Sequence, residues 1–236
     1  MDFTRMDFDF AGPTFKKAKK PPRDGAAERQ FKVENILNLG YAQFPGAGAY
    51  DIPIIEPVYE IGMIDEWIKF ENSYTRTDIE DKGLIFFSDD YQFERVWNNP
   101  DRYIDRLKQF KVVLSPDFSP YGDMPLATQI FNHYRKHWCA AYWQMHGVTV
   151  IPTIRASTDP RSLDFYLDGE PKGGIVAFST MWSDDLDDEM REEFRLMVET
   201  LNPCKVLVYG KVLDWIKAYR IPTQQILHFS KTWRNG

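Results

Sequence analysis

Polar side chains that can bind a sugar or a phosphate follow most of the apolar segments of this 236-residue chain. Each apolar segment has the length of a buried strand in a sheet. The polar residues just beyond these segments are Ser88, Asp89, Ser115, Asp117, Ser119, Arg155, Ser179 and Tyr209. Hydroxyls and carboxylates hydrogen-bond the hydroxyls of a sugar, and an arginine guanidinium pairs with a phosphate or a carboxylate. We therefore predict a ligand-binding site composed of these residues.

One carboxylate in this set, that of Asp117, has no evident structural task. It lies between two prolines in the sequence SPDFSP, after an apolar segment and well before the next helical pattern. For the other serines and aspartates, capping of the following helix is the competing interpretation. We predict that Asp117 is a catalytic base or a metal ligand, that Asp89 is a second catalytic carboxylate, and that Arg155 binds an anionic group.

The histidines and cysteines do not form a recognisable metal or cofactor motif. His133 and His137 are one helical turn apart, but Tyr-Arg-Lys separates them, so the zinc-protease motif is absent and no third ligand stands out. We expect both imidazoles to be solvated on a basic helix face, and we expect no metal site. The two cysteines form no CxxC pair, and there is no Walker A sequence, GxSxG elbow or GxGxxG after the first strand. The sequence therefore names no cofactor.

The elements that must position these residues alternate between strands and helices from about residue 83 onward. Strands are predicted at 83–88, 111–114, 148–154, 175–178, 205–208 and 225–229, with a short edge strand at 165–167. Helices are predicted at 101–110, 125–146, 186–201 and 212–219. This alternation predicts parallel βαβ units, whose strands end at the same edge of the sheet. An open sheet is favoured, because a complete eight-stranded barrel needs about 250 residues.

The fold class is therefore α/β: a single domain with a mainly parallel sheet flanked by helices, preceded by an extended arm. We expect the extended N-terminal arm at 1–32, an irregular or helical lead-in at 33–82, and the α/β domain at 83–236. No run of 18 apolar residues occurs, so we expect no membrane-spanning helix and no membrane partner.

The arm contains five basic residues with no acidic residue among them: Lys16, Lys17, Lys19, Lys20 and Arg23. Lysine and arginine neutralise phosphates, which makes the arm a candidate nucleic-acid contact. The net charge of −6 argues against attraction of nucleic acid to the whole surface. The alternatives are that the lysines keep the arm solvated, or that they pair with the acidic helix near 184–193.

Several segments resemble a family of unknown function found mainly in bacteriophages, prophages and mobile elements of bacteria. They are SPDFSPYGDMP, NHYRKHWCAAYWQMHG, VTVIPTI, IVAFST and NPCKVLVYG, and they cover about residues 80–230. The sequence differs from the family at Arg155 and Ala156, where a tryptophan is more usual, so the resemblance does not support Arg155 as a family site. The resemblance implies a cytoplasmic protein of a phage-infected or element-bearing bacterium and implies no particular reaction.

Three functions remain open at this point. The first is a nucleic-acid-associated accessory protein of a phage or mobile element, supported by the basic arm and the 15% aromatic residues. The second is an enzyme acting on a phosphorylated, sugar or nucleotide substrate at the carboxyl edge of the sheet. The third is a structural or inhibitory protein that docks a protein partner through its aromatic N-terminal arm.

Overall fold

The computed structural model describes residues 36–181 and 187–227. The chain consists of two units, Met1–Gln43 and Phe44–Gly236. In the first unit the described part contains the short 3-10 helix η1 (Ile36–Asn38). The basic residues of the predicted arm lie outside the described residues. Everything that follows concerns the second unit, which contains the sheet and its helices.

Two four-stranded parallel sheets form the centre of this unit. The first contains β3 (Trp67–Lys69), β4 (Gly83–Ile85), β5 (Val112–Leu114) and β6 (Val150–Ile151). The second contains β7 (Thr153–Ile154), β8 (Ile175–Ser179), β9 (Lys205–Tyr209) and β10 (Thr223–Ile226). The predicted α/β class with a mainly parallel sheet is confirmed. The sheet also includes β3, which lies before the first strand that the sequence pattern indicated.

The two sheets meet at Pro152, which separates β6 from β7. Proline lacks the N–H that a strand needs for its ladder, so the strand is interrupted there. The Pro152 carbonyl still accepts a hydrogen bond from the amide of Ala177 at 2.8 Å. The strands therefore follow one another across both sheets in chain order. Among the described residues no ladder joins β3 to β10, but the side chain of Gln224 in β10 donates to the carbonyl of Ile64, just before β3, at 3.1 Å.

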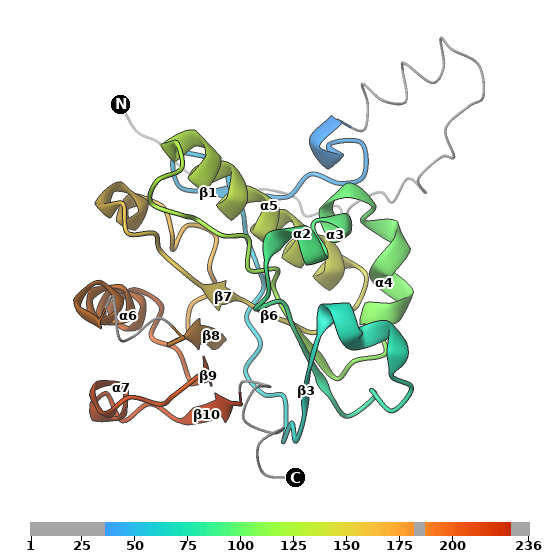
Figure 1. The fold of residues 1–236 in the computed structure, drawn as a ribbon. Coiled ribbons are helices and arrows are strands. Elements are labelled where there is room, and N and C mark those ends of the chain that lie inside the picture. Colours follow the sequence, from blue (N-terminus) through green and yellow to red (C-terminus); the bar gives the residue numbers. More distant parts are fainter. Residues whose placement is uncertain (1–35, 182–186, 228–236) are drawn as a thin grey trace, which may run out of the picture. The chain divides into compact units, whose positions relative to one another are not determined.

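A single apolar core lies against one face of both sheets. Its strand residues include Trp67, Ile85, Leu114, Ile151, Ala177, Leu207 and Ile226. Because side chains alternate between the two faces of a strand, the positions between these residues point the other way. In β8 and β9 those positions pack against helices α6 (Asp187–Leu201) and α7 (Asp214–Ala218), which lie beside β8–β10 in Figure 1. The shared core implies that the sheet curves around it.

The remaining helices follow strands β3, β4, β5 and β7. They are η2 (Phe70–Thr75), α2 (Asp90–Phe93), α3 (Arg95–Asn98), α4 (Asp101–Leu107), α5 (Leu126–Met145) and η3 (Pro160–Asp164). An antiparallel hairpin, β1 (Gly46–Ala47) and β2 (Ile52–Pro53), precedes them. The predicted edge strand at 165–167 is wrong, because these residues form turns after η3. Among the described helices, none is both long enough and apolar enough to cross a bilayer.

Candidate functional site

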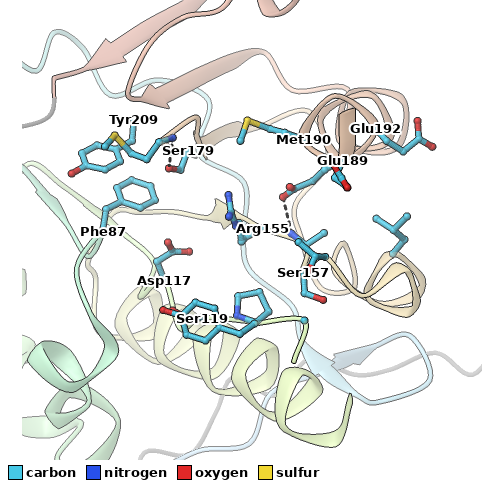
Figure 2. A pocket seen from close by; sticks show the side chains of 18 of the residues that line it. Phe87, Asp117, Ser119, Arg155, Ser157, Ser179, Glu189, Met190, Glu192 and Tyr209 are labelled. Carbon is cyan, nitrogen blue, oxygen red and sulfur yellow. Dashed lines mark hydrogen bonds between the residues drawn. The ribbon is translucent and has the colours of Figure 1, made fainter. Parts of the chain in front are cut away.

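A cavity of about 820 Å³ opens at the carboxyl edge of the sheet (Figure 2). Its volume falls within the range of small-molecule sites in proteins, which is about 300–1,000 Å³. Its lining includes Ser88, Asp89, Asp117, Ser119, Arg155, Ser179 and Tyr209. The structure thus brings together all the residues of the predicted site except Ser115. The Ser115 side chain is buried and hydrogen-bonds the hydroxyl of Thr153 at 2.8 Å.

Strand periodicity explains why these side chains converge. Ala177 and Leu207 belong to the shared core, so Ser179 and Tyr209, two positions further on, face the same side above it. These two residues are also partners in the ladder between β8 and β9. Arg155 follows Ile151 at an even spacing and lies just beyond β7. The cavity therefore adjoins the apolar core at the carboxyl ends of the strands, where polar side chains replace the aliphatic side chains of the core.

The loop that carries Asp117 is held in place by hydrogen bonds on its far side. The backbone amide and hydroxyl of Ser119 both donate to the carboxylate of Asp90, at 3.2 and 2.9 Å. The Asn132 side chain donates to the Ser119 carbonyl at 2.7 Å. These contacts fix the backbone, while the Asp117 carboxylate lies in the cavity and makes no hydrogen bond or ion pair with another described residue (Figure 2). Burial raises the pKa of Asp117, and the positive charge of Arg155 opposes that rise.

Arg155 lies half-buried in the middle of the cavity, between Asp117 and helix α6 (Figure 2). Within the described ranges, neither a hydrogen bond nor an ion pair joins its guanidinium to another residue. Arginine in such a position offers up to five donors to a ligand. The fixed geometry of the fork suits a carboxylate, a phosphate or two neighbouring hydroxyls.

A second buried carboxyl group, that of Glu193 in α6, was not predicted from the sequence. Its side chain is 6% exposed and accepts a hydrogen bond from the amide of Ala156 at 2.7 Å. Burial raises the pKa of Glu193 to about 7, with Arg155 opposing the rise and Asp117 adding to it. The helical spacing held a signal, because Glu193 lies three residues after Met190 and four before Met197, both of which are buried.

One wall of the cavity is aromatic. The ring of Phe87 stacks on that of Tyr209, with 4.3 Å between centroids and 9° between planes. Burial raises the pKa of Tyr209 to about 12, so its phenol is neutral at ordinary pH. Phe87 is only half-buried, so part of its ring remains available to a ligand. A flat apolar wall beside hydroxyls and carboxyls suits a sugar or a nucleobase.

The two remaining predicted residues lie at the rim. Ser88 donates its hydroxyl to the carboxylate of Glu71 at 3.0 Å, and Asp89 is exposed. The Asp89 carboxyl is therefore more exposed to solvent than the carboxyls of Asp117 and Glu193. The roles assigned to these residues stay predictions.

The expectation that His133 and His137 are solvated is wrong. His133 is 6% exposed and His137 is fully buried. Residues distant in sequence cover them, since the His137 ring bonds the carbonyl of Pro53 at 2.8 Å and the His133 ring bonds that of Asp168 at 3.0 Å. Burial lowers the pKa of both imidazoles.

Comparison with known proteins identifies the family to which the chain belongs. The model of a domain of unknown function, DUF4417, matches residues 44–229. The Gene 1 protein of Mycobacterium phage L5 is 39% identical over 184 residues, which is 75% of this chain and 78% of that protein. The Gene 1 protein of Mycobacterium phage D29 is 37% identical over 183 residues, 75% of this chain and 66% of that protein. No solved structure matches. The match across most of the chain and its phage relatives show that the chain belongs to the DUF4417 family.

Proposed function

We propose that the protein is a hydrolase that cleaves a glycosidic or phosphoester bond of a small ring-containing substrate in this cavity. One observation carries the proposal: two carboxyl groups with raised pKa values, Asp117 and Glu193, flank an arginine whose guanidinium makes no hydrogen bond or ion pair with any described residue, in a cavity of ligand size. Perturbed acids in a cleft are typical of catalytic sites. The proposal rests on the residues of the cavity and not on the family, which has no assigned reaction.

The two carboxyls suit different halves of the reaction. Glu193, with a pKa of about 7, is partly protonated near neutral pH and can give a proton to the leaving oxygen. Asp117 is opposed in its pKa rise by Arg155 and Lys136, and in its ionised form it can take a proton from the attacking water. Water thus gives its hydroxyl to the substrate and its proton to Asp117, while the leaving group takes the proton of Glu193. Exchange with solvent then returns Asp117 and Glu193 to their starting protonation states. Two carboxyls with separate roles are the usual arrangement of glycoside hydrolases.

The charges around the cavity narrow the substrate class. Its lining contains two basic residues, Lys69 and Arg155, and six acidic residues: Asp89, Asp117, Asp188, Glu189, Glu192 and Glu193. A polyanion such as nucleic acid would be repelled by this lining. A neutral sugar, or a ring with a single anionic group directed at Arg155, fits better. The Phe87–Tyr209 wall would stack on the ring.

The test uses two series of 4-nitrophenyl substrates, glycosides in one and phosphate mono- and diesters in the other. We expect the wild-type protein to release nitrophenol from at least one series, with a bell-shaped pH profile. Asp117→Asn and Glu193→Gln should each lower kcat by about 10²–10⁴-fold. The control is Glu199→Gln, an exposed residue of the same helix that bonds Arg195. No release by the wild-type protein, or unchanged kcat in both variants, refutes the proposal.

A second proposal, that the basic segment from Lys16 to Arg23 contacts nucleic acid, is supported by its charge and by the phage relatives. The segment lies outside the described residues, so the support comes from sequence alone. Either activity would be exerted in the cytoplasm of a phage-infected host, in keeping with relatives encoded by phages.

A further inference from the structure

A second cluster of ionisable residues, which the proposed hydrolysis does not use, lies between α5, β2 and the turn at 168–170. It consists of His133, His137 and Glu170, all buried, with one potential ligand atom from each residue within 4.8 Å of the others. The two imidazole rings have centroids 4.4 Å apart, as their spacing of four residues on α5 dictates. The sequence offered two of these residues, and the fold supplies the third.

Each ring uses one nitrogen for a carbonyl outside the cluster and turns the other nitrogen toward the cluster, where Nε2 of His137 contacts Glu170. His133 uses Nε2 to donate to the Asp168 carbonyl, and His137 uses Nδ1 to donate to the Pro53 carbonyl. In a neutral imidazole the other nitrogen then has no hydrogen and can accept or ligate. Metal-binding histidines almost always donate their second N–H in this way, frequently to a backbone carbonyl.

Glu170 is oriented so that one of its oxygens remains available. Its Oε1 accepts from the ammonium of Lys136 at 2.7 Å and lies 2.9 Å from Nε2 of His137. Its Oε2 is buried and has no hydrogen-bond partner in the described part of the structure. A buried carboxylate oxygen without a partner is unfavourable, and a bound cation would remove that penalty. Because Nδ1 of His137 donates to the Pro53 carbonyl, the contact between Nε2 and Glu170 requires a positive charge, which either a second proton on the ring or a metal ion shared with the carboxylate supplies.

A glycine lets the carboxylate approach the rings. Gly169 has a φ of +76°, and a Cβ there would lie 2.5 Å from the Pro53 carbonyl oxygen and 2.9 Å from Nδ1 of His137. Only glycine combines this φ with such close packing. The backbone of the turn therefore packs directly against the imidazole of His137.

We propose that His133, His137 and Glu170 bind one divalent transition-metal ion, of which Zn²⁺ is the representative. Two imidazole nitrogens and one carboxylate oxygen form a donor set used for zinc, whereas Mg²⁺ and Ca²⁺ prefer oxygen alone. Lys136 orients the carboxylate from outside, and the Asp168 carboxyl, close enough to His137 to influence it electrostatically, adds negative charge. The ion would join α5 to the turn before β8. This inference replaces the expectation of no metal site and is independent of the proposed hydrolysis.

The test begins with the full-length wild-type protein, stripped of metal by a chelator and dialysed. Titration with Co²⁺, followed by its visible absorption, and with Zn²⁺, followed by calorimetry, should give one ion per chain, with Zn²⁺ displacing Co²⁺. Chelation should also lower the Tm. Absence of stoichiometric binding by the wild-type protein overturns the proposal, whatever the variants do.

Two substitutions and one control locate the site. Glu170→Gln and His133→Gln should each weaken Zn²⁺ binding by at least about 100-fold, since each removes a direct ligand and losses from outer-shell changes already reach 10–100-fold. His146→Gln changes a histidine at the end of the same helix, outside the cluster, and should bind as the wild type does. Circular dichroism checks that each variant is folded. If His146→Gln loses as much affinity as His133→Gln, the ion binds elsewhere and the assignment is wrong.

Discussion

The raised pKa of Glu193 makes a quantitative prediction about stability. Its carboxyl is buried, and its pKa rises from an ordinary value of 4.5 to about 7 in the folded protein. Between these two pH values the unfolded chain has released the proton that the folded chain retains. Stability therefore falls as pH rises through this window, by about 1.4 kcal/mol per pH unit for a single group. The total loss above pH 7 is about 3 kcal/mol.

Replacing Glu193 with glutamine removes this loss. The amide oxygen of glutamine can still accept the hydrogen bond from the Ala156 amide, which the carboxylate accepts at 2.7 Å. We expect Glu193→Gln to exceed the wild-type stability by about 1 kcal/mol or less at pH 5 and by about 3 kcal/mol at pH 8. Urea unfolding of both proteins at four pH values between 5 and 8 measures the difference.

The control for this experiment is Glu199→Gln on the same helix. Glu199 is exposed and pairs with Arg195, so its substitution should change stability by less than about 0.5 kcal/mol at every pH. A difference between Glu193→Gln and the wild type that stays constant from pH 5 to 8 would refute the reasoning. It would mean that Glu193 ionises in the folded protein as readily as in water.

Four further outcomes can be measured. Arg155→Gln should weaken binding of inorganic phosphate by about 10-fold or more in calorimetry, and the free energy of unfolding should change little because the guanidinium bonds no described residue. Equal phosphate affinity of the two proteins contradicts this prediction. Arg135→Gln should cost about 2 kcal/mol in urea unfolding, because its guanidinium pairs with the carboxylate of Glu94 at 2.6 Å and covers the Phe118 ring at 3.8 Å; a loss below about 0.5 kcal/mol would count against this. Gly169→Ala should lower the Tm more than Gly147→Ala, since both have positive φ but a Cβ at 147 meets no atom within 4 Å; equal effects would show that packing is not the cause. Deletion of residues 1–24 should abolish binding of labelled DNA or RNA in low salt, with each single lysine change in full-length protein reducing the salt slope by about one; identical binding by both chains excludes the arm.

Most strands and the long helices could be predicted from the sequence because their apolar residues form clear runs or helical periods. Every residue of 150–154 and of Ile175–Phe178 is buried, and mainly apolar runs are what strands covered on both faces require. The strand β3 was missed, although β4 and β5 are equally short, because only two apolar residues stand there between Glu66 and Lys69. The strand expected at 165–167 is absent because Phe165 and Tyr166 are buried in turns. A short apolar segment in the sequence does not distinguish buried turns from a buried strand.

Part of the site could be predicted from the sequence for a related reason. Parallel strands end at one edge, so Asp117, Arg155 and Ser179 could be assigned to one place from strand order alone. Glu193 comes from a helix whose acidic residues resemble a solvated face, and only its spacing from buried methionines marks it. The burial of His137 depends on Pro53 and Glu170, which are distant in the sequence, so no local pattern could show it.

The stacked pair of Phe87 and Tyr209 has a consequence for how the two sheets are held together. Phe87 follows β4 in the first sheet and Tyr209 ends β9 in the second, and four ladders and the break at Pro152 separate these strands in the sheet order. An aromatic contact of this kind contributes about 0.5–1.5 kcal/mol beyond the area it buries. The stack therefore ties the two sheets together directly at the cavity wall, and its loss would leave them joined there only through the intervening strands.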